Sequence, residues 1–445
     1  MNKNGNGTSV VERGQGAVLR SLGWLAGTEL LDRVGLRKQV ERMVFQGTKN
    51  GFRTATAAGR AFKATQKLGR PARQSAGKPR DLFDLTPDDE QQMFQEAVRD
   101  FAEAKVRPAA QDADEKRETP AELLAQTSEL GVNMLGIPEE LGGVMQEQAA
   151  TTSALVGEAL AHGDMGIAYA ALAPGAVATA IGHWGSAEQQ ATYLPAFAGE
   201  DAPAAALALL EPRPLFDPLS LETKARREGS DWVLDGAKSL VARAADCELF
   251  VVAAAVEGGG PALFVVESGC EGLSVQDEPA MGLRPAATGR LLLEGARLPA
   301  GALLGEGSRE DYVECVQRAR IAWGALAVGA AQAVLDYTIP YVNERTAFGE
   351  PISNRQAVAF GVSDIGIESS GMRLAVYRAA SRADQGEDFA REAALARKLC
   401  AAKGMEIGSE GVQLLGGHGF VKEHPVERWY RDLRAAGVME GALLV

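Results

Sequence analysis

The sequence has few of the residues that build metal and disulfide sites. Its 445 residues include only four cysteines and four histidines. The cysteines are 23, 45 and 85 residues apart, so no pair has the spacing of a zinc knuckle or a redox motif, and the histidines form no ligand pair at helical spacing. We therefore expect no metal site, no disulfide framework and a reducing compartment.

Long apolar runs are also missing. The longest stretch without charge, residues 165–187, consists mostly of Ala and Gly and contains Pro174, His183 and Ser186, which argues against a transmembrane helix. The overall composition, 46% hydrophobic and 24% charged, is that of a folded globular chain and excludes wholesale disorder. The length predicts two to four structural units.

The chain as a whole has no excess of positive charge. The net charge of −13 argues against a nucleic-acid binder. However, residues 1–80 hold 16 Lys and Arg against 4 Asp and Glu, whereas the remaining residues hold 30 against 55. A basic helical arm and linker, residues 1–84, therefore precedes an acidic body.

Three interpretations of the arm remain open. Its basic residues alternate with apolar ones such as Trp24, Leu30 and Val34, so it could lie on an anionic membrane surface. It could instead pack on the body or a partner, or be a transit peptide, since it is rich in Arg and poor in acid. We expect a cytoplasmic location, peripheral at the membrane under the first interpretation and mitochondrial under the third.

Helix signals dominate the first part of the body. Thr86 as N-cap and Pro87 at the first helical position predict a helix that Pro108 ends. A second helix is predicted from Pro120 to Leu130, stopped by Gly131. Residues 150–200 are rich in Ala and are predicted to form further helices.

The pattern changes to strands after Leu210 and back to helices from Asp311 to about residue 436. The strand signals are a run before an Asp235-Gly236 turn, two buried runs at 249–253 and 263–266 joined by a hairpin, and a run at 290–294. This order favours segregated α and β domains over an alternating sheet. We predict an α+β fold with an N-terminal α domain, a middle β domain and a C-terminal α bundle, at 85–206, 207–308 and 309–445.

Several short segments match, in residue type and in order along the chain, the motifs of one known protein family. They are Leu209-Leu210-Glu211-Pro212, Met281-Gly282-Leu283-Arg284, Arg297-Leu298-Pro299, residues 344–352 (ERTAFGEPI), residues 413–420 (QLLGGHGF), residues 425–432 (PVERWYRD) and Val438-Met439-Glu440-Gly441. Together with the order of helices and strands, they resemble the acyl-CoA dehydrogenase family over residues 85 to 441. The resemblance implies that family's fold, with a barrel-like middle domain.

The resemblance also implies an activity. Family members use FAD to convert a fatty acyl-CoA thioester to the 2-enoyl-CoA, a reaction of β-oxidation in fatty acid metabolism. A flavin accepts the hydride because no side chain can, and a carboxylate takes the α proton. Glu440 matches the family's base, and Arg320 and Gly441 match positions at the substrate. Some members carry the base just before that Arg, where this chain has Ala319, so Glu440 has no rival.

The residues that match the family's flavin site fall into two groups. The adenine and pyrophosphate side is kept, at Arg345, Phe348, Gln413, Gly416 and Gly417. On the isoalloxazine side, Leu209, Leu210, Leu240 and Ala242 occupy the matching positions, and most of the changes there remove a hydroxyl or an aromatic wall. Each lost hydrogen bond costs on the order of 1 kcal/mol.

Two functions are compatible with a flavin site whose adenine side is kept and whose isoalloxazine side is changed. The first is an FAD-dependent acyl-CoA dehydrogenase that works as a homo-oligomer and passes electrons to an electron-transferring flavoprotein. The second is a non-catalytic or half-site subunit of a heteromeric acyl-CoA dehydrogenase, or a scaffold, with a paralogous partner subunit. Because Glu440 is close to the last residue of the sequence, we also expect it to lie on a frayed segment unless a partner covers it.

Overall fold

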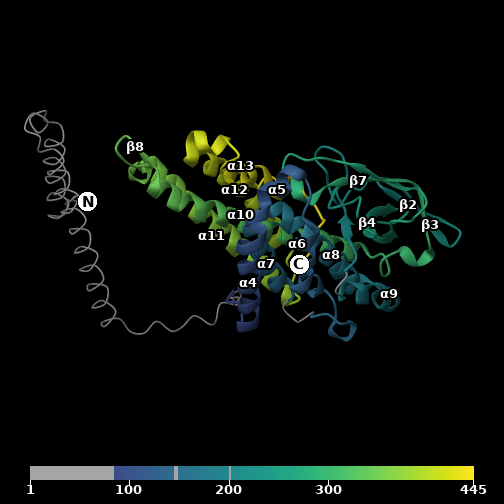
Figure 1. Cartoon of the computed structure of the whole chain (residues 1–445). Helices are drawn as coiled ribbons and strands as arrows, with labels where there is room; N and C mark the ends of the chain where they lie inside the picture. Colours follow the sequence, from purple (N-terminus) through teal and green to yellow (C-terminus); the bar gives the residue numbers. More distant parts are fainter. Residues whose placement is uncertain (1–84, 145–148, 200–201) are drawn as a thin grey trace, which may run out of the picture. The chain divides into compact units, whose positions relative to one another are not determined.

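The computed structural model describes residues 85–144, 149–199 and 202–445. The predicted basic arm, residues 1–84, lies outside this part of the chain. The described residues form an N-terminal group of helices, a middle group of strands and a C-terminal group of helices, which confirms the predicted fold (Figure 1).

Two sequence predictions about the N-terminal helices are wrong. The first helix is capped by Asp88 and not Thr86, because Asp88 and Gln91 cap each other's backbone N–H groups, the Gln91 N–H lying 2.8 Å from the Asp88 carboxylate. Pro108 does not end the helix. A π-helical turn precedes it and shifts the hydrogen-bond register, so the missing N–H of proline falls where the register changes. The helices are α4 (Asp89–Phe101), η1 (Ala102–Val106), α5 (Arg107–Lys116), α6 (Ala121–Glu129), α7 (Ala149–Gly163), α8 (Met165–Trp184) and α9 (Ala187–Phe197).

The middle strands form one sheet in the order β1-β4-β2-β3-β7-β6, with β5 paired to β4. The predicted hairpin is confirmed as β4–β5. The predicted turn at Asp235-Gly236 is wrong, because β3 continues past it and Gly236 sits at a shift in register against β7. The strands are β1 (Ala205–Ala208), β2 (Lys224–Glu228), β3 (Asp231–Val241), β4 (Leu249–Val256), β5 (Pro261–Glu267), β6 (Leu273–Asp277) and β7 (Gly289–Leu298).

Three long helices make up most of the C-terminal part. They contact one another along their lengths and lie side by side in Figure 1. They are followed by two short helices just before Glu440. The elements are α10 (Arg309–Glu344), the hairpin β8 (Thr346–Ala347) and β9 (Glu350–Pro351), α11 (Gln356–Asp384), α12 (Ala390–Leu415), α13 (Val426–Asp432) and α14 (Ala435–Val438).

Helix α8 is long and apolar enough to cross a membrane by length and composition. However, 89% of its most apolar window is buried inside the protein, as expected for a core helix. It packs between α7, α10 and β1. In the described ranges the cysteines are free, and no group of three or more His, Cys, Asp or Glu side chains is arranged to hold a metal ion.

A buried network of charged groups joins the three parts. Asp164 caps α8 and accepts a hydrogen bond from Arg428 Nε of α13 at 2.8 Å. Asp432, which is also on α13, accepts a hydrogen bond from the backbone N–H of Leu283 at 2.6 Å. Leu283 lies in the loop between β6 and β7. The other oxygen of Asp432, Oδ2, has no hydrogen-bond partner among the described residues. Burial, reinforced by the charge of Asp164, raises the pKa of Asp432 to about 7.

Asp432→Asn is expected to change how stability depends on pH. The raised pKa means that folded Asp432 keeps its proton where the unfolded chain has lost it, so its contribution to stability falls as the pH rises towards about 7. An asparagine carries no proton to lose. The variant should therefore match the wild type only below about pH 3.8, the ordinary pKa of an aspartate, and melt a few degrees higher at pH 8, by scanning calorimetry. Asp112→Asn, at an exposed site on α5, should show no such difference; equal pH curves for Asp432→Asn and the wild type would contradict this assignment.

Candidate active site

Glu440 is buried between two arginines. It follows α14 and is only 6% exposed. Arg320 of α10 donates to both carboxylate oxygens, from Nε to Oε2 at 3.1 Å and from Nη2 to Oε1 at 3.0 Å. Arg397 of α12 lies on the other side, with its Nε 2.9 Å from Oε1. The prediction of a frayed segment is therefore wrong, because two guanidinium groups from long helices fix the carboxylate.

The backbone after Glu440 is held equally closely. The indole N–H of Trp323 donates to the carbonyl of Gly441 at 2.6 Å. Gly441 has a φ of +71°, and a Cβ at this position would lie 2.5 Å from the Cβ of Leu209. Only glycine fits there, because it tolerates the left-handed conformation and the close approach of Leu209.

A pair of buried rings connects this loop with the predicted isoalloxazine side. The rings of Trp323 and Tyr169 lie 5.0 Å apart, and the Tyr169 hydroxyl donates to the carbonyl of Leu240 at 2.8 Å. Since Trp323 is bonded to Gly441, the two rings connect the loop that carries Glu440 with Leu240. The structure thus brings Glu440, Gly441, Leu209 and Leu240 into one region.

The residues of the predicted isoalloxazine side are apolar and mostly buried. Leu209, Leu210 and Ala242 are buried. Leu240 has a φ of +52°, its N–H donates to Glu278 Oε2 at 2.8 Å, and its carbonyl accepts from Tyr169. The Leu210 carbonyl accepts from the N–H of Ser239 at 2.9 Å. These backbone groups are therefore bonded within the protein, and the four predicted side chains offer no hydrogen bond.

A buried ion pair between Lys238 and Glu211 lies beside the segments that carry Leu209 and Leu240. Lys238 Nζ lies 2.9 Å from Glu211 Oε1 and donates to the Leu209 carbonyl at 3.2 Å. Glu211 also accepts from two backbone N–H groups, those of Glu222 and Thr223. Burial lowers the pKa of Lys238 to about 8, while Lys238 and the N–H donors outweigh burial and hold the pKa of Glu211 below its ordinary value. Both groups therefore stay charged at pH 7.

The adenine-side residues gather at the far end of α10 and α12. Phe348, in the turn between β8 and β9, is 96% exposed with a φ of +57°. Gly416 and Gly417 follow α12, and an added Cβ at either would meet open space. Arg345 and Gln413 are exposed at the ends of the two helices. Tyr341 bonds His418 Nδ1 at 2.8 Å and so ties these ends together.

The two groups of predicted flavin residues are connected to α10 at widely separated points along its length. Trp323, which reaches the predicted isoalloxazine side through Tyr169, and Arg345, the C-cap of α10, are 22 residues apart, which at 1.5 Å per residue corresponds to about 33 Å. That separation exceeds the length of an extended dinucleotide. A single flavin could therefore meet both groups only if they came from two different chains.

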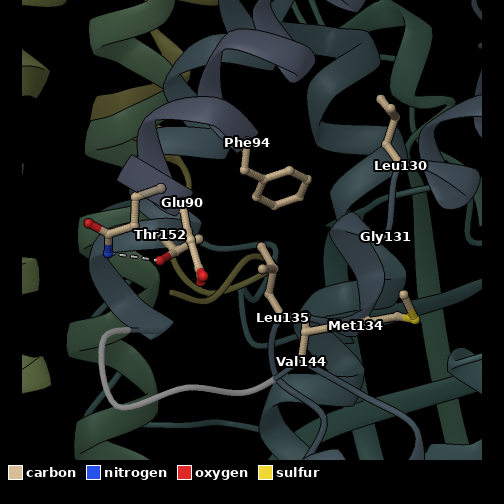
Figure 2. Close-up of a pocket in the computed structure, with 9 residues that line it drawn as sticks. Glu90, Phe94, Leu130, Gly131, Met134, Leu135, Val144 and Thr152 are labelled. Atoms are coloured by element: carbon tan, nitrogen blue, oxygen red, sulfur yellow. Dashed lines mark hydrogen bonds between the residues drawn. The ribbon is translucent and has the colours of Figure 1, made fainter. Parts of the chain in front are cut away.

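Two of the cavities in the described helical parts of the chain differ in size and in position relative to the predicted site. One, of about 250 Å³, is lined by Phe94, Leu130, Met134 and Val144 (Figure 2), and none of the predicted site residues lines it. The other has a volume of only about 30 Å³, room for about one water molecule, and no charged side chain lines it. Its walls come from α7, α8, α10 and the segment that follows Glu440: Val132, Leu135, Ser153, Val156, Gly157, Leu172, Gly175, Ala176, Thr179, Ala322, Leu326 and Leu443–Val445.

Comparison with known families decides the assignment. The acyl-CoA dehydrogenase N-terminal domain matches residues 88–201, the middle domain 206–296 and the C-terminal domain 311–443. A probable acyl-CoA dehydrogenase of Bacillus subtilis is 33% identical over 368 residues, which cover 81% of this chain and 96% of that protein. The chain belongs to the acyl-CoA dehydrogenase family. It is an oxidoreductase of this FAD-dependent family, as predicted.

Solved structures agree with the family assignment. The structure described as the electron transferring flavoprotein of Acidaminococcus fermentans is 28% identical with a TM-score of 0.75, covering 81% of this chain and 96% of that one. A glutaryl-CoA dehydrogenase from Mycobacterium smegmatis in complex with FADH2 is 26% identical with a TM-score of 0.71, covering 79% and 90%. The family relative thus binds a reduced flavin on this fold.

Proposed function

We propose that this protein catalyses the FAD-dependent α,β-dehydrogenation of an acyl-CoA thioester, with Glu440 as the base. The observation that carries the proposal is the buried carboxylate of Glu440. It matches the family's base position, and the next residue, Gly441, packs against Leu209 of the predicted isoalloxazine side.

The residues of this chain account for the proton transfer. Oε2 of Glu440 accepts a hydrogen bond only from Arg320 among the described residues, so it retains a lone pair for the α proton of the substrate. Arg320 and Arg397 hold the carboxylate in place, which keeps the base oriented before the substrate binds. When bound, FAD would accept the hydride that leaves the β carbon.

The fit to FAD differs between the two groups of residues. On the adenine side, the guanidinium of Arg345 can pair with a pyrophosphate, and the open space around Gly416 and Gly417 allows close backbone approach. On the isoalloxazine side, the chain supplies apolar contact only. We therefore propose that FAD binds between two subunits. We also propose that its isoalloxazine ring is bound more weakly than in other family members.

An exposed apolar stripe on α11 supports association with a second subunit. Phe360, Ile367 and Leu374 are spaced seven residues apart, so they lie along one face of the helix, and each is more than half exposed. Such a stripe is typical of a surface that a partner covers. We propose a homo-oligomer, with a paralogous partner subunit as the alternative.

The second candidate function is the half-site subunit. It is favoured by the internal hydrogen bonds of Leu240 and Leu210, which leave these backbone groups engaged. In that case the chain would lend Glu440 or its adenine-side residues to a paralogue with an intact ring site. The electron acceptor, under either function, is proposed to be an electron-transferring flavoprotein.

The visible spectrum of the purified chain tests the proposal. FAD is added, unbound flavin is removed, and an acyl-CoA is then added without oxygen. Retained flavin absorbance that bleaches with substrate would support dehydrogenation by this chain alone. A protein that cannot be loaded with FAD, and that bleaches only when a paralogous subunit is present, would favour the half-site subunit.

Mixing two inactive variants is expected to restore activity if the flavin site is shared between subunits. Glu440→Gln removes the base and Arg345→Gln removes the pyrophosphate partner. In a mixed dimer, one site combines the intact Glu440 of one chain with the intact Arg345 of the other. After exchange of subunits at equal amounts, about one quarter of the wild-type activity should return, because half of the dimers are mixed and each has one intact site. Absence of any recovery, despite mixed dimers detected by native mass spectrometry, would contradict a shared site.

The membrane interpretation of the arm remains a proposal. Residues 1–80 carry 16 basic and 4 acidic residues, so electrostatic attraction to anionic lipid is expected. The intact chain should sediment with anionic liposomes at low salt, and a chain lacking residues 1–80 should stay in the supernatant. Equal sedimentation of the two would contradict a membrane role.

A further inference from the structure

We propose that Arg397 is a positioning residue that holds both the side chain and the backbone of the loop carrying Glu440. The inference rests on the proposed function, in which Glu440 is the base. Arg397 belongs to α12, is separated from Glu440 by more than forty residues of sequence, and matches none of the motifs that point to the family.

The contacts of Arg397 are concentrated on one short segment. Its Nε lies 2.9 Å from Glu440 Oε1. Its Nη1 donates to the carbonyls of Ala436 at 2.9 Å and Met439 at 2.7 Å, and its Nη2 donates to the carbonyl of Gly437 at 3.4 Å. One guanidinium therefore bonds the carboxylate and three of the four carbonyls that precede Glu440.

The segment needs such a donor. Helix α14 has only four residues, Ala435–Val438, so nearly all of its carbonyls lack a partner within the helix. A cation at the C-terminal end of a helix satisfies these carbonyls and interacts favourably with their dipoles. The Arg397 side chain is 15% exposed, so little water is present to replace it.

The second arginine has a different contact pattern. Arg320 bonds both oxygens of Glu440 in a fork but donates to no carbonyl of the loop. Its part is to balance and orient the carboxylate. Arg397 in addition fixes the position of the backbone from which the carboxylate projects.

Arginine geometry is required for this role. The guanidinium presents several N–H groups in a rigid plane, so it can meet a carboxylate and a row of carbonyls at once. A lysine would keep the positive charge near Oε1 but could satisfy fewer of the carbonyls. Arg397→Lys should therefore recover part of what Arg397→Met loses.

The experiment compares Arg397→Met, Arg397→Lys and a matched control, Arg382→Met. Arg382, on α11, also bonds a backbone carbonyl, that of Asp388, and pairs with carboxylates, but it does not contact Glu440. Two readouts are taken. Amide hydrogen exchange of residues 436–441 reports the loop without any cofactor or substrate. The FAD-loaded protein gives kcat, KM and the isotope effect with an α-deuterated acyl-CoA.

We expect Arg397→Met to speed exchange across residues 436–441 and to lower kcat by roughly 10- to 100-fold with little change in KM, since a misplaced base slows the chemical step. The α-deuterium isotope effect on kcat should rise, because proton abstraction becomes more rate-limiting. Arg397→Lys should fall between Arg397→Met and the wild type. Arg382→Met should leave the exchange of this segment unchanged.

Unchanged exchange of residues 436–441 in Arg397→Met would overturn the inference. So would a loss of activity that matches a loss of folded protein with an unaltered isotope effect, because that is the result of a merely structural role. Glu440→Gln is measured in parallel. If Glu440→Gln keeps its activity, the proposed function fails; if it is inactive while Arg397→Met has wild-type exchange and kinetics, only the positioning role fails.

Discussion

Glu440→Gln is expected to lower the rate of acyl-CoA dehydrogenation by at least about 10²- to 10⁴-fold, the usual contribution of a general base. Glutamine has nearly the shape of glutamate but cannot accept the α proton. The measurement is kcat/KM of the FAD-loaded protein with an acyl-CoA and an artificial electron acceptor. Unaltered dehydrogenation would remove Glu440 from the mechanism.

Glutamine also removes the negative charge between Arg320 and Arg397, so a second variant is needed. Glu440→Asp keeps this charge and withdraws the carboxylate by one methylene group. It should fold as the wild type does by circular dichroism and still lose most of its activity, because the base no longer reaches the α carbon. A fully active Glu440→Asp would contradict a role that depends on the position of the carboxylate.

Lys238→Met is expected to destabilise the protein strongly. It leaves the buried Glu211 carboxylate with the more distant guanidinium of Arg213, 3.9 Å away, and removing one partner of a buried ion pair costs about 3–5 kcal/mol. The Leu209 carbonyl also loses a donor. The denaturant concentration at the midpoint of unfolding should fall accordingly, and FAD retention should fall with it because β3 and the segment at Leu209 carry the residues predicted to contact the isoalloxazine ring.

The double variant Lys238→Met with Glu211→Leu is the control. It removes both charges, and an apolar pair of similar size is often neutral relative to the ion pair. A large part of the lost stability should therefore return. A midpoint for Lys238→Met within error of the wild type would contradict the assigned role of the pair.

Much of the fold was predictable because helix and strand signals are local. The β4–β5 hairpin follows from two apolar runs with glycines between them, and the order of helices and strands separates the α and β parts. The errors share a physical cause. Pro108 and Asp235-Gly236 carry strong local signals for an end or a turn, but a π-helical turn and a shift in strand register accommodate them.

The candidate site was only partly predictable for a similar reason. Glu440, Arg320 and Gly441 follow from motifs, whereas Arg397 and the rings of Tyr169 and Trp323 reach the site from distant helices. The only sequence signal for Arg397 is its place beside the core residues Ala393, Ala396 and Cys400 on α12. A basic residue on such a face is buried only if it finds an anion, and the sequence does not say which one.

Exchange of the substrate's α hydrogen with solvent tests the central claim most directly. The FAD-loaded protein is incubated without oxygen in D₂O with a saturated acyl-CoA, and deuterium at the α carbon is measured by mass spectrometry. The wild type is predicted to incorporate deuterium and Glu440→Gln to incorporate none above the background without enzyme. Equal incorporation by the two proteins, or none by a wild type that reduces its flavin, would contradict Glu440 as the base.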